Sequence, residues 1–258
     1  MLLVTLGFSG MICIDIGQKP MIIFEAEDLM EKTIELISKI SVFNGLSPAQ
    51  LEDVRQIADY RNFAKNETIF LEGDQGIGFF VVVEGQVKIF KLAMDGKEHI
   101  LHIIGPGEPF GEVAVFAGKS FPANAEALVD SRLLFFPRNG FVTLISRNPS
   151  LAMKMLAVLS MRLRQFAVQI ENLSLKEVPG RLASYLIFLT HEQENIEVVI
   201  LPISKGQLAS LLGTIPETLS RMFAKMAGQG LIEVHGRNIS ILDLVGLEEI
   251  SIQGKVTD

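Results

Sequence analysis

Hydrophobic and polar residues follow two different periods along the chain. Between Arg61 and Phe136 the apolar residues form short runs rich in β-branched and aromatic side chains, and glycine or polar residues separate the runs. Short runs at this spacing predict an antiparallel β-roll or barrel. The predicted strands are Thr68–Leu71, Gly78–Val83, Gln86–Leu92, His99–Ile104 and Ser131–Phe136.

After Pro149 the apolar residues adopt a helical period. They recur at alternating spacings of three and four, which is the a/d pattern of a coiled coil and predicts a parallel dimer. A helix packed on its own domain usually has a wider apolar stripe, and that alternative stays open. The predicted dimer interface consists of Leu156, Leu159, Leu163, Phe166, Ile170 and Leu173.

The segment that follows the long helix contains a helix breaker. Pro179 and Gly180 close the run from Leu175 to Gly180. Proline lacks the amide that a helix interior needs, and glycine weakens a helix. We therefore expect the whole run to interrupt the helix and to act as a hinge.

Two consecutive helix starts follow Ile203. Ser204 and Gln207 have the spacing of a capping box, in which each side chain satisfies the backbone amide of the other residue. Gly213 is placed to end this first helix with a turn. Thr214 then repeats the start signal, with Pro216 in the first turn of a second helix. Two helices joined by a tight glycine turn form a helix-turn-helix.

The second helix has two distinct faces. Leu219, Met222, Phe223 and Met226 form an apolar face, whereas Glu217, Ser220 and Arg221 lie three and four residues apart on another face. Arginine can donate twice to guanine and glutamate can accept from cytosine, so this second face is predicted to read bases in the major groove. A surface ion pair between Glu217 and Arg221 is the alternative.

A β-hairpin is predicted directly after the second helix. Its strands are Gly230–Val234 and Ile239–Leu242, and residues 235–238 form the turn. A hairpin in this position is typical of a wing. Polar residues around the two helices and the wing are predicted to contact DNA phosphates, which position a protein without specifying sequence. These residues are Ser204, Lys205, Thr218, Lys225 and Arg237.

Composition limits what these patterns can mean. With 258 residues and 48% apolar content, the chain can form two globular domains. The net charge of −7 is unusual for a DNA-binding protein. The acidic excess lies mainly in the first half, because residues 21–150 hold 12 basic and 18 acidic side chains. The only cysteine, Cys13, cannot supply the thiolates of an iron–sulfur cluster.

No enzyme motif stands out in the sequence. We find no phosphate-binding Walker loop, zinc-ligand cluster, nucleophile elbow or Cys–His arrangement, so we do not expect an enzyme. The apolar first twenty residues carry no positive charge before Lys19 and match neither a signal peptide nor a membrane-spanning helix. They are interpreted as a loosely held extension or as the result of a misplaced start codon. We expect a cytoplasmic protein without membrane contact.

The two halves together resemble the CRP/FNR transcription regulators. In the front half the resemblance rests on residues 72–74, 83–87 and 106–112, and in the back half on Pro216 to Arg221. It implies an α+β fold with an antiparallel, cyclic-nucleotide-binding-like β-roll, a dimerisation helix and a winged helix-turn-helix. The predicted limits are 1–30 for an extension, 31–148 for the effector domain, 149–175 for the helix, 176–250 for the DNA-binding domain and 251–258 for a tail.

The resemblance also implies the partners. A homodimer would bind near-palindromic double-stranded DNA with TTGA-like or TGTGA-like half-sites, and RNA polymerase would be a further partner. A cyclic-nucleotide-gated regulatory subunit would share the β-roll. It would have no reason to carry the recognition helix that begins at Pro216.

The effector site departs from the nucleotide-binding members. In those members a Gly-Glu pair, here Gly111–Glu112, and an Arg-Ser pair hold the cyclic phosphate and ribose. The Arg-Ser pair is replaced here by residues of the Phe121–Asn124 stretch, and no guanidinium replaces its charge. On the long helix Phe166–Ala167 replaces the Thr-Ser pair that meets the base. The predicted pocket comprises Gly111, Glu112, Val113, Ala123, Asn124, Phe166 and Ala167.

These departures favour an effector other than cyclic AMP. They are similar to those of the DNR and HcpR branches, which are associated with haem and nitric oxide. Haem requires an axial ligand, and the candidates are His99, His102 and His191. None of the three lies in a diagnostic spacing. A regulator that responds to a cyclic nucleotide is the alternative.

Overall fold

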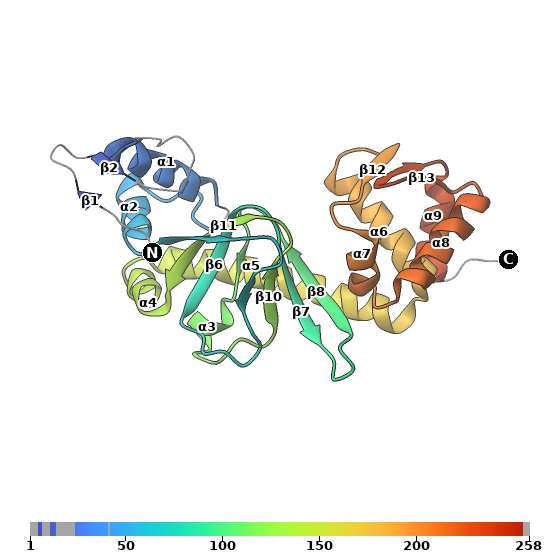
Figure 1. The fold of residues 1–258 in the computed structure, drawn as a ribbon, viewed down its shortest axis with the longest axis horizontal. Helices are drawn as coiled ribbons and strands as arrows, with labels where there is room; N and C mark the ends of the chain where they lie inside the picture. Colours follow the sequence, from blue (N-terminus) through green and yellow to red (C-terminus); the bar gives the residue numbers. More distant parts are fainter. Residues whose placement is uncertain (1–4, 7–10, 14–23, 41, 255–258) are drawn as a thin grey trace. The chain divides into compact units, whose positions relative to one another are not determined.

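The computed structural model describes residues 5–6, 11–13, 24–40 and 42–254. The chain divides into two compact units, one of residues 1–87 and 104–156, the other of residues 88–103 and 157–258. Figure 1 labels most of the elements of both. The interpretations of the N-terminal extension lie for the most part outside the described residues, as does half of the predicted tail, residues 255–258.

The predicted antiparallel roll consists of two sheets, and its strands belong to the first unit except for most of β7 and β8. One sheet has the order β4-β11-β6-β9, and a second has the order β5-β10-β7-β8. Figure 1 labels β6, β7, β8, β10 and β11. β11 pairs antiparallel with both β4 and β6, so that Leu134 faces Tyr60 on one side and Val81 on the other. The bounds are β4 Asp59–Phe63, β5 Thr68–Phe70, β6 Gly78–Glu84, β7 Val87–Leu92, β8 Glu98–Ile104, β9 Pro109–Phe110, β10 Asn124–Ala127 and β11 Ser131–Pro137.

All five predicted strands are confirmed, each within one residue at one end. Three strands of the roll were not expected: β4, β9 and β10. A further small sheet joins β1 (Thr5–Leu6), β2 (Met11–Cys13) and β3 (Phe24–Glu25) in that order.

Aromatic rings fill the core between the roll and its helices. The rings of Phe79 and Phe136 stack with centroids 4.9 Å apart, and Phe141 meets Phe79 edge-on at 4.6 Å. Phe141 comes from a helix, so the cluster joins sheet and helix, and burying rings of this size is a large part of the stability of such a core. The helices of this unit are α1 Ala26–Lys39, α2 Pro48–Gln56, α3 Val113–Phe116 and α4 Arg138–Arg147.

The long predicted helix is α5, Pro149–Leu175. Its first turns belong to the first unit, where Leu151 and Met155 are buried. Further along, Leu156, Leu163 and Ile170 are more than half exposed in the single chain. The helix therefore carries a row of large apolar side chains that its own chain does not cover.

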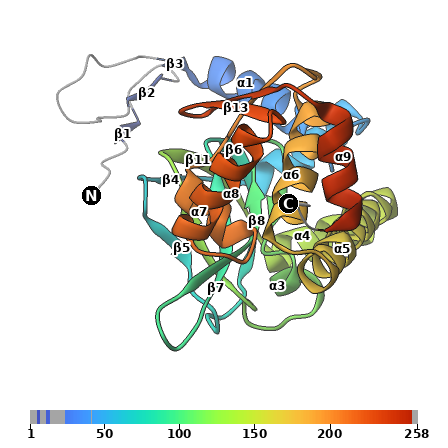
Figure 2. The same cartoon turned by 90° about the vertical axis from the view of Figure 1, so that its right-hand side faces the viewer.

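The second unit contains α6, α9 and a small sheet around the helix-turn-helix, together with most of α5 (Figure 2). The sheet has the order β12-β14-β13. α6 and α9 lie side by side, and Glu177 N donates to Gly254 O at 2.9 Å beside them. The elements are α6 Val178–Glu192, β12 Val198–Ile200, α7 Lys205–Leu211, α8 Pro216–Gly228, β13 Ile232–His235, β14 Asn238–Ile241 and α9 Leu244–Gln253.

The predicted hinge is wrong in its extent. Only Lys176 and Glu177 separate α5 from α6, because α6 already begins at Val178. Pro179 lies in the first turn, where the missing amide has no helical partner to lose. Gly180 is inside the helix and close-packed: a Cβ there would lie 2.6 Å from the Cα of Gly254. This glycine serves helix packing rather than a bend.

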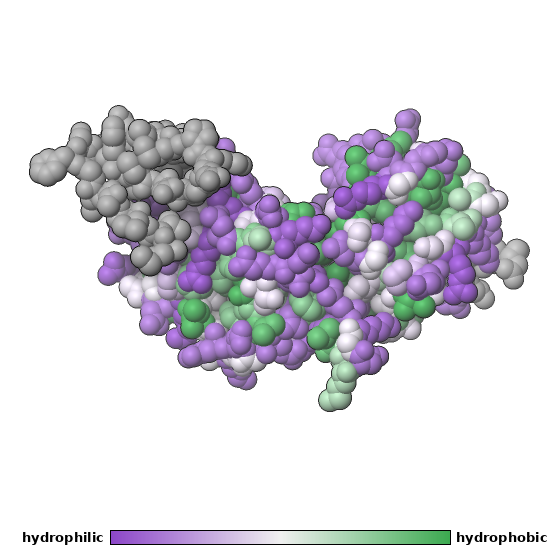
Figure 3. Space-filling model, in the orientation of Figure 1, coloured by the Kyte–Doolittle hydropathy of each residue, from purple (hydrophilic) through white to green (hydrophobic). Residues whose placement is uncertain are grey.

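Hydrophobic side chains also lie on the surface of the second unit. Figure 3 shows them among polar residues over the part that holds α8 and α9. On α9, Val245 and Ile252 are largely exposed. None of the described helices combines the length and the apolar character that crossing a membrane requires.

Candidate DNA-reading helix and effector site

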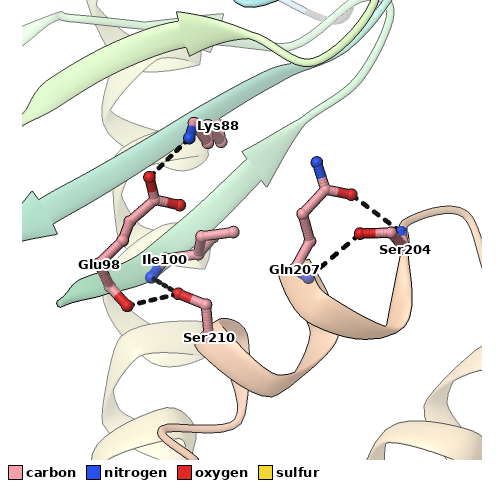
Figure 4. Close-up of polar contacts among 6 residues, drawn as sticks. All are labelled: Lys88, Glu98, Ile100, Ser204, Gln207 and Ser210. Atoms are coloured by element: carbon pink, nitrogen blue, oxygen red, sulfur yellow. Dashed lines mark hydrogen bonds and ion pairs between the residues drawn. The ribbon is translucent and has the colours of Figure 1, made fainter. Parts of the chain in front are cut away.

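The capping box at the start of α7 is confirmed. Gln207 N donates to Ser204 Oγ at 3.2 Å, and Ser204 N donates to Gln207 Oε1 at 2.8 Å (Figure 4). These two bonds satisfy amides that a helix start leaves without partners, and such a cap contributes about 1 kcal/mol. They fix the first residue of the helix-turn-helix.

The turn between the two helices is built on a left-handed glycine. Gly213 has a φ of +63°, which residues with a Cβ rarely adopt. The expectation that Thr214 caps the second helix is wrong. Ile215 is the N-cap and makes no side-chain capping bond. Thr214 N instead donates to Ala209 O at 2.9 Å, so this residue belongs to the turn.

α8 presents the predicted polar face outward. Leu219, Phe223 and Met226 are buried, whereas Glu217, Ser220 and Arg221 are exposed. Within the described chain, Arg221 Nη2 donates to Thr218 Oγ1 at 3.0 Å, and no ion pair joins Arg221 to Glu217. The guanidinium therefore keeps most of its donors available to a ligand.

The wing is confirmed as a hairpin with a two-residue loop. His235 pairs with Asn238, and Gly236 between them has a φ of +65°. A positive φ at this position is characteristic of the tight turns that match the twist of two strands. Arg237 Nη2 donates to the carbonyl oxygen of Pro202 at 3.1 Å.

The predicted phosphate contacts surround α8. The Nζ atom of Lys205 lies 5.1 Å from the centre of the Phe223 ring, and Thr218 and Lys225 are half-buried. Ser204 uses its hydroxyl for the helix cap. Whether these residues touch DNA stays a prediction.

One polar contact of α7 was missed by the sequence reasoning. Ser210 Oγ accepts from Ile100 N at 3.1 Å and donates to Glu98 O at 2.7 Å, both on β8 (Figure 4). Lys88 Nζ forms an ion pair with Glu98 at 2.6 Å. A serine in a predicted helix gives no sign of a partner more than a hundred residues away, so no sequence pattern could have found it.

The predicted effector residues of the first unit surround the short helix α3. Gly111 has a φ of +78°, and Glu112, which is only 5% exposed, is the N-cap of α3. A Cβ on Gly111 would lie 3.1 Å from the ring of Phe121. This ring is stacked on Phe70, with centroids 3.7 Å apart. Aromatic side chains therefore line the space next to the Gly–Glu pair.

The stretch that replaces the family's Arg-Ser pair is mostly buried. Ala123 and Asn124 are buried, and Asn124 Oδ1 accepts from Glu72 N at 2.9 Å. Val113 is partly exposed on α3. Phe166 and Ala167 belong to the second unit, and their place in the effector pocket stays a prediction.

The three candidate haem ligands have different surroundings. His99 Nδ1 lies 2.9 Å from Ser210 O, and His191 is exposed at the end of α6. Burial, with a smaller effect of the positive charge on Arg162, lowers the pKa of His102 to about 4. Its ring meets Phe166 edge-on at 6.3 Å. The described residues contain no cluster of three or more His, Cys, Asp or Glu that could hold a metal ion.

Comparison with known families matches both parts of the chain. Residues 60–148 match the cyclic nucleotide-binding domain, and residues 180–250 match the Crp-like helix-turn-helix domain. The cyclic AMP receptor protein of Thermus thermophilus is 30% identical over 210 residues, which cover 81% of this chain and 96% of the relative. The CRP-like cAMP-activated global transcriptional regulator of Mycobacterium tuberculosis is 28% identical, covering 81% and 95%.

Solved structures give the same result. FixK2 from Bradyrhizobium japonicum superposes with a TM-score of 0.67 at 25% identity, covering 78% of this chain and all of that chain. The relative from Mycobacterium tuberculosis is named as a transcriptional regulator, in agreement with the prediction that the protein is not an enzyme. The Crp-like helix-turn-helix implies that the protein binds DNA. The protein therefore belongs to the CRP/FNR family of transcription regulators.

Proposed function

We propose that the protein is a homodimeric regulator that reads near-palindromic DNA with α8 in the cytoplasm and acts together with RNA polymerase. The observation that carries this proposal is the outward position of Glu217, Ser220 and Arg221 on a helix whose opposite face is buried. Two such helices related by a two-fold axis match two half-sites about one helical turn apart.

Base reading is assigned to the side chains with suitable donors and acceptors. Arg221 donates to guanine O6 and N7, and Glu217 accepts from cytosine N4 in a TTGA-like or TGTGA-like half-site. Ser220 adds a hydroxyl group on the same face. Lys225 and Arg237, with Ser204, Lys205 and Thr218, position the protein on phosphates.

The division between base and phosphate contacts can be tested with two variants. Arg221→Ala is expected to cost about 1–3 kcal/mol on the matched site and to remove the preference for the G·C pair. Lys225→Ala is expected to weaken binding to all sequences. It is also expected to reduce the slope of log affinity against log salt concentration by about one, the equivalent of one phosphate contact. Fluorescence anisotropy with matched and mismatched duplexes measures both. Equal loss by both variants on both duplexes would refute the assignment.

We place dimerisation on the exposed row of α5. Leu156, Leu163 and Ile170 alternate with Leu159, Phe166 and Leu173 at coiled-coil spacing, and the single chain leaves the first three largely uncovered. A second copy of the helix would remove this surface from water, at about 25 cal/mol for each Å² of apolar area.

The effector is proposed to be other than a cyclic nucleotide. A cyclic phosphate next to Gly111 and Glu112 would meet the stacked rings of Phe70 and Phe121. Asn124 already accepts a backbone hydrogen bond. Burying a phosphate without a cation is costly. Calorimetric titration with cyclic AMP is expected to give no heat of binding, and saturable binding would contradict the proposal.

A cyclic-nucleotide-responsive regulator is the second candidate. It is favoured by the relatives, since those from Mycobacterium tuberculosis and Thermus thermophilus are named for their response to or binding of cyclic AMP. The same titration decides between the two.

Haem is the effector that the partly buried His102 supports. His102 is held neutral by its surroundings, and neutral imidazole is the form that binds iron. Haem would supply an iron centre that binds nitric oxide. The absorption spectrum of the protein reconstituted with haem tests this, with His102→Leu as the variant and His191→Leu as the matched control. A spectrum unchanged by His102→Leu removes His102 as a ligand.

A further inference from the structure

The second unit contains a cavity whose lining residues include His102, a candidate haem ligand, and Leu173 of the proposed dimer row. It has a volume of about 520 Å³ and is lined by residues of β8, α5, α6 and α7 and of the segments that join the helices. Its walls are mostly apolar, and they include Leu173, Tyr185, Phe188 and Leu212. This size lies within the range of small-molecule sites in proteins.

The side chains in the cavity wall that carry a full charge at neutral pH are all cationic. Arg164, Lys176 and Arg181 line it, whereas no Asp or Glu is among the described residues that form its wall. Lys176 Nζ donates to Ser184 Oγ at 2.9 Å, and Arg181 Nη1 donates to Leu212 O at 2.7 Å. Neutral acceptors hold both cations. Their positive charge is therefore not balanced by a carboxylate of the wall.

Arg181 also has a donor without an acceptor. Its Nε atom is buried and has no hydrogen-bond partner in the described structure. A buried N–H group without a partner is unfavourable, and this adds to the cost of burying the guanidinium group. An anion compensates for the burial of the guanidinium charge.

The aromatic wall is suited to an apolar body. The rings of Tyr185 and Phe188 lie with centroids 6.3 Å apart. Burial raises the pKa of Tyr185 to about 12, so that its hydroxyl group stays protonated and can donate to an anion. Hydrocarbon packed on these rings and on Leu212 would be removed from water.

We infer that this cavity binds an organic anion with an apolar body, such as a medium-chain monocarboxylate. Its carboxylate accepts from Arg181 and Lys176, and its hydrocarbon part lies against Tyr185, Phe188 and Leu212. The positive charge of the cavity selects for an anionic group, and the apolar wall selects for hydrocarbon. A sugar lacks the hydrocarbon part, and an organic cation lacks the negative charge. This site is separate from the effector residues around α3 and does not depend on the proposed base reading.

Calorimetry of the full chain with octanoate tests the inference, with 1-octanol as the uncharged match. Octanoate is expected to bind at least tenfold more tightly than 1-octanol, because hydrogen bonds between charged groups add roughly 1.5–3 kcal/mol. Arg181→Gln is expected to raise the Kd for octanoate roughly tenfold or more. Arg147→Gln, which removes an exposed cation at the end of α4, is the matched control and leaves the Kd unchanged.

A charge reversal keeps the test decisive if Arg181→Gln does not fold. Lys176→Glu should lose octanoate and gain octylammonium, because the new carboxylate faces the same cavity. Equal affinity for octanoate and 1-octanol, or octanoate binding unchanged by Lys176→Glu, would overturn the inference. Absence of any octanoate binding would also overturn it. This holds even if binding is absent because a second copy of the chain covers the cavity. DNA binding of the same sample shows separately whether the regulator function holds.

Discussion

The hydroxyl group of Ser210 donates a hydrogen bond to the backbone carbonyl of Glu98, with the two oxygens 2.7 Å apart. The same oxygen accepts from Ile100 N at 3.1 Å. His99 Nδ1, between these two residues in sequence, lies 2.9 Å from the carbonyl oxygen of Ser210. α7, the first helix of the helix-turn-helix, is thus fixed to β8 through both the side chain and the backbone of one serine.

Ser210→Ala should weaken this attachment. The change leaves Ile100 N and Glu98 O without their partner, at a cost of roughly 1–3 kcal/mol. Hydrogen exchange of the Ile100 amide should accelerate, and the urea midpoint should fall. Ser220→Ala on the exposed face of α8 is the control and should leave both unchanged. An Ile100 amide that exchanges in Ser210→Ala at the wild-type rate would show that the bond contributes nothing in solution.

Most local signals were read correctly, and the Thr214 cap is the exception. The Ser204–Gln207 cap, the Gly213 turn and the Gly236 hairpin depend on residues within a few positions of one another. The apolar row on α5 could be predicted because its spacing of three and four residues can be read directly from the sequence. The apolar strand β6 was found for a similar reason, since an unbroken apolar run is itself a strand signal.

Elements that depend on distant partners were missed. β4 reads Asp-Tyr-Arg-Asn-Phe and is partly exposed, and it is a strand because it pairs with β11 about seventy residues away. The misreading of Pro179 and Gly180 has the same origin. In the sequence, a Pro-Gly pair that breaks a helix cannot be told from one that begins a helix. The difference here is the contact of Gly180 with Gly254 at the end of α9. The contact of Ser210 with β8 belongs to this class.

Gly180→Ala should destabilise the second unit. The added Cβ would lie 2.6 Å from Gly254 Cα, and backbone on both sides cannot yield without moving α6 from α9. Overpacking of this kind costs roughly 1–3 kcal/mol. Gly206→Ala is the matched control, because its nearest neighbour would be Ser204 Oγ at 3.9 Å and alanine favours a helix. The midpoint of thermal unfolding should be lower for Gly180→Ala than for the wild type, and for Gly206→Ala it should be equal to or above that of the wild type. The reverse order would contradict the close packing.

The buried imidazole of His102 should make stability depend on pH. Burial lowers its pKa to about 4 in the folded protein, whereas an unfolded chain has a histidine pKa of about 6.5. Below about 6.5 the unfolded state therefore binds more protons, and stability falls with pH until about 4. The loss between pH 7 and pH 5 is about 2 kcal/mol.

Urea unfolding at pH 7 and pH 5 measures this contribution. His102→Gln should reduce the difference between the two pH values by about that amount, whereas His191→Gln, at an exposed site, should preserve it. An unchanged difference in His102→Gln would mean that the imidazole is solvated.

The coiled-coil row makes the oligomeric state sensitive to one charge. Leu163 is 70% exposed in the single chain, and lysine at this position would place an ammonium group in the seam of the proposed dimer. Leu163→Lys should therefore shift the mass measured by sedimentation equilibrium from dimer toward monomer. Affinity for a two-half-site duplex should fall with it, because the second reading helix is no longer linked to the first.

Met161 provides the matched control for this variant. It is 66% exposed on the same helix but lies off the row. Met161→Lys makes the same chemical change and should leave both the mass and the affinity unaltered. If both variants remained dimers at the lowest measurable concentration, the interface would lie elsewhere, since a buried unpaired charge on each of two facing helices costs several kcal/mol. The residues from Leu156 to Leu173 would then face solvent or the protein's own surface.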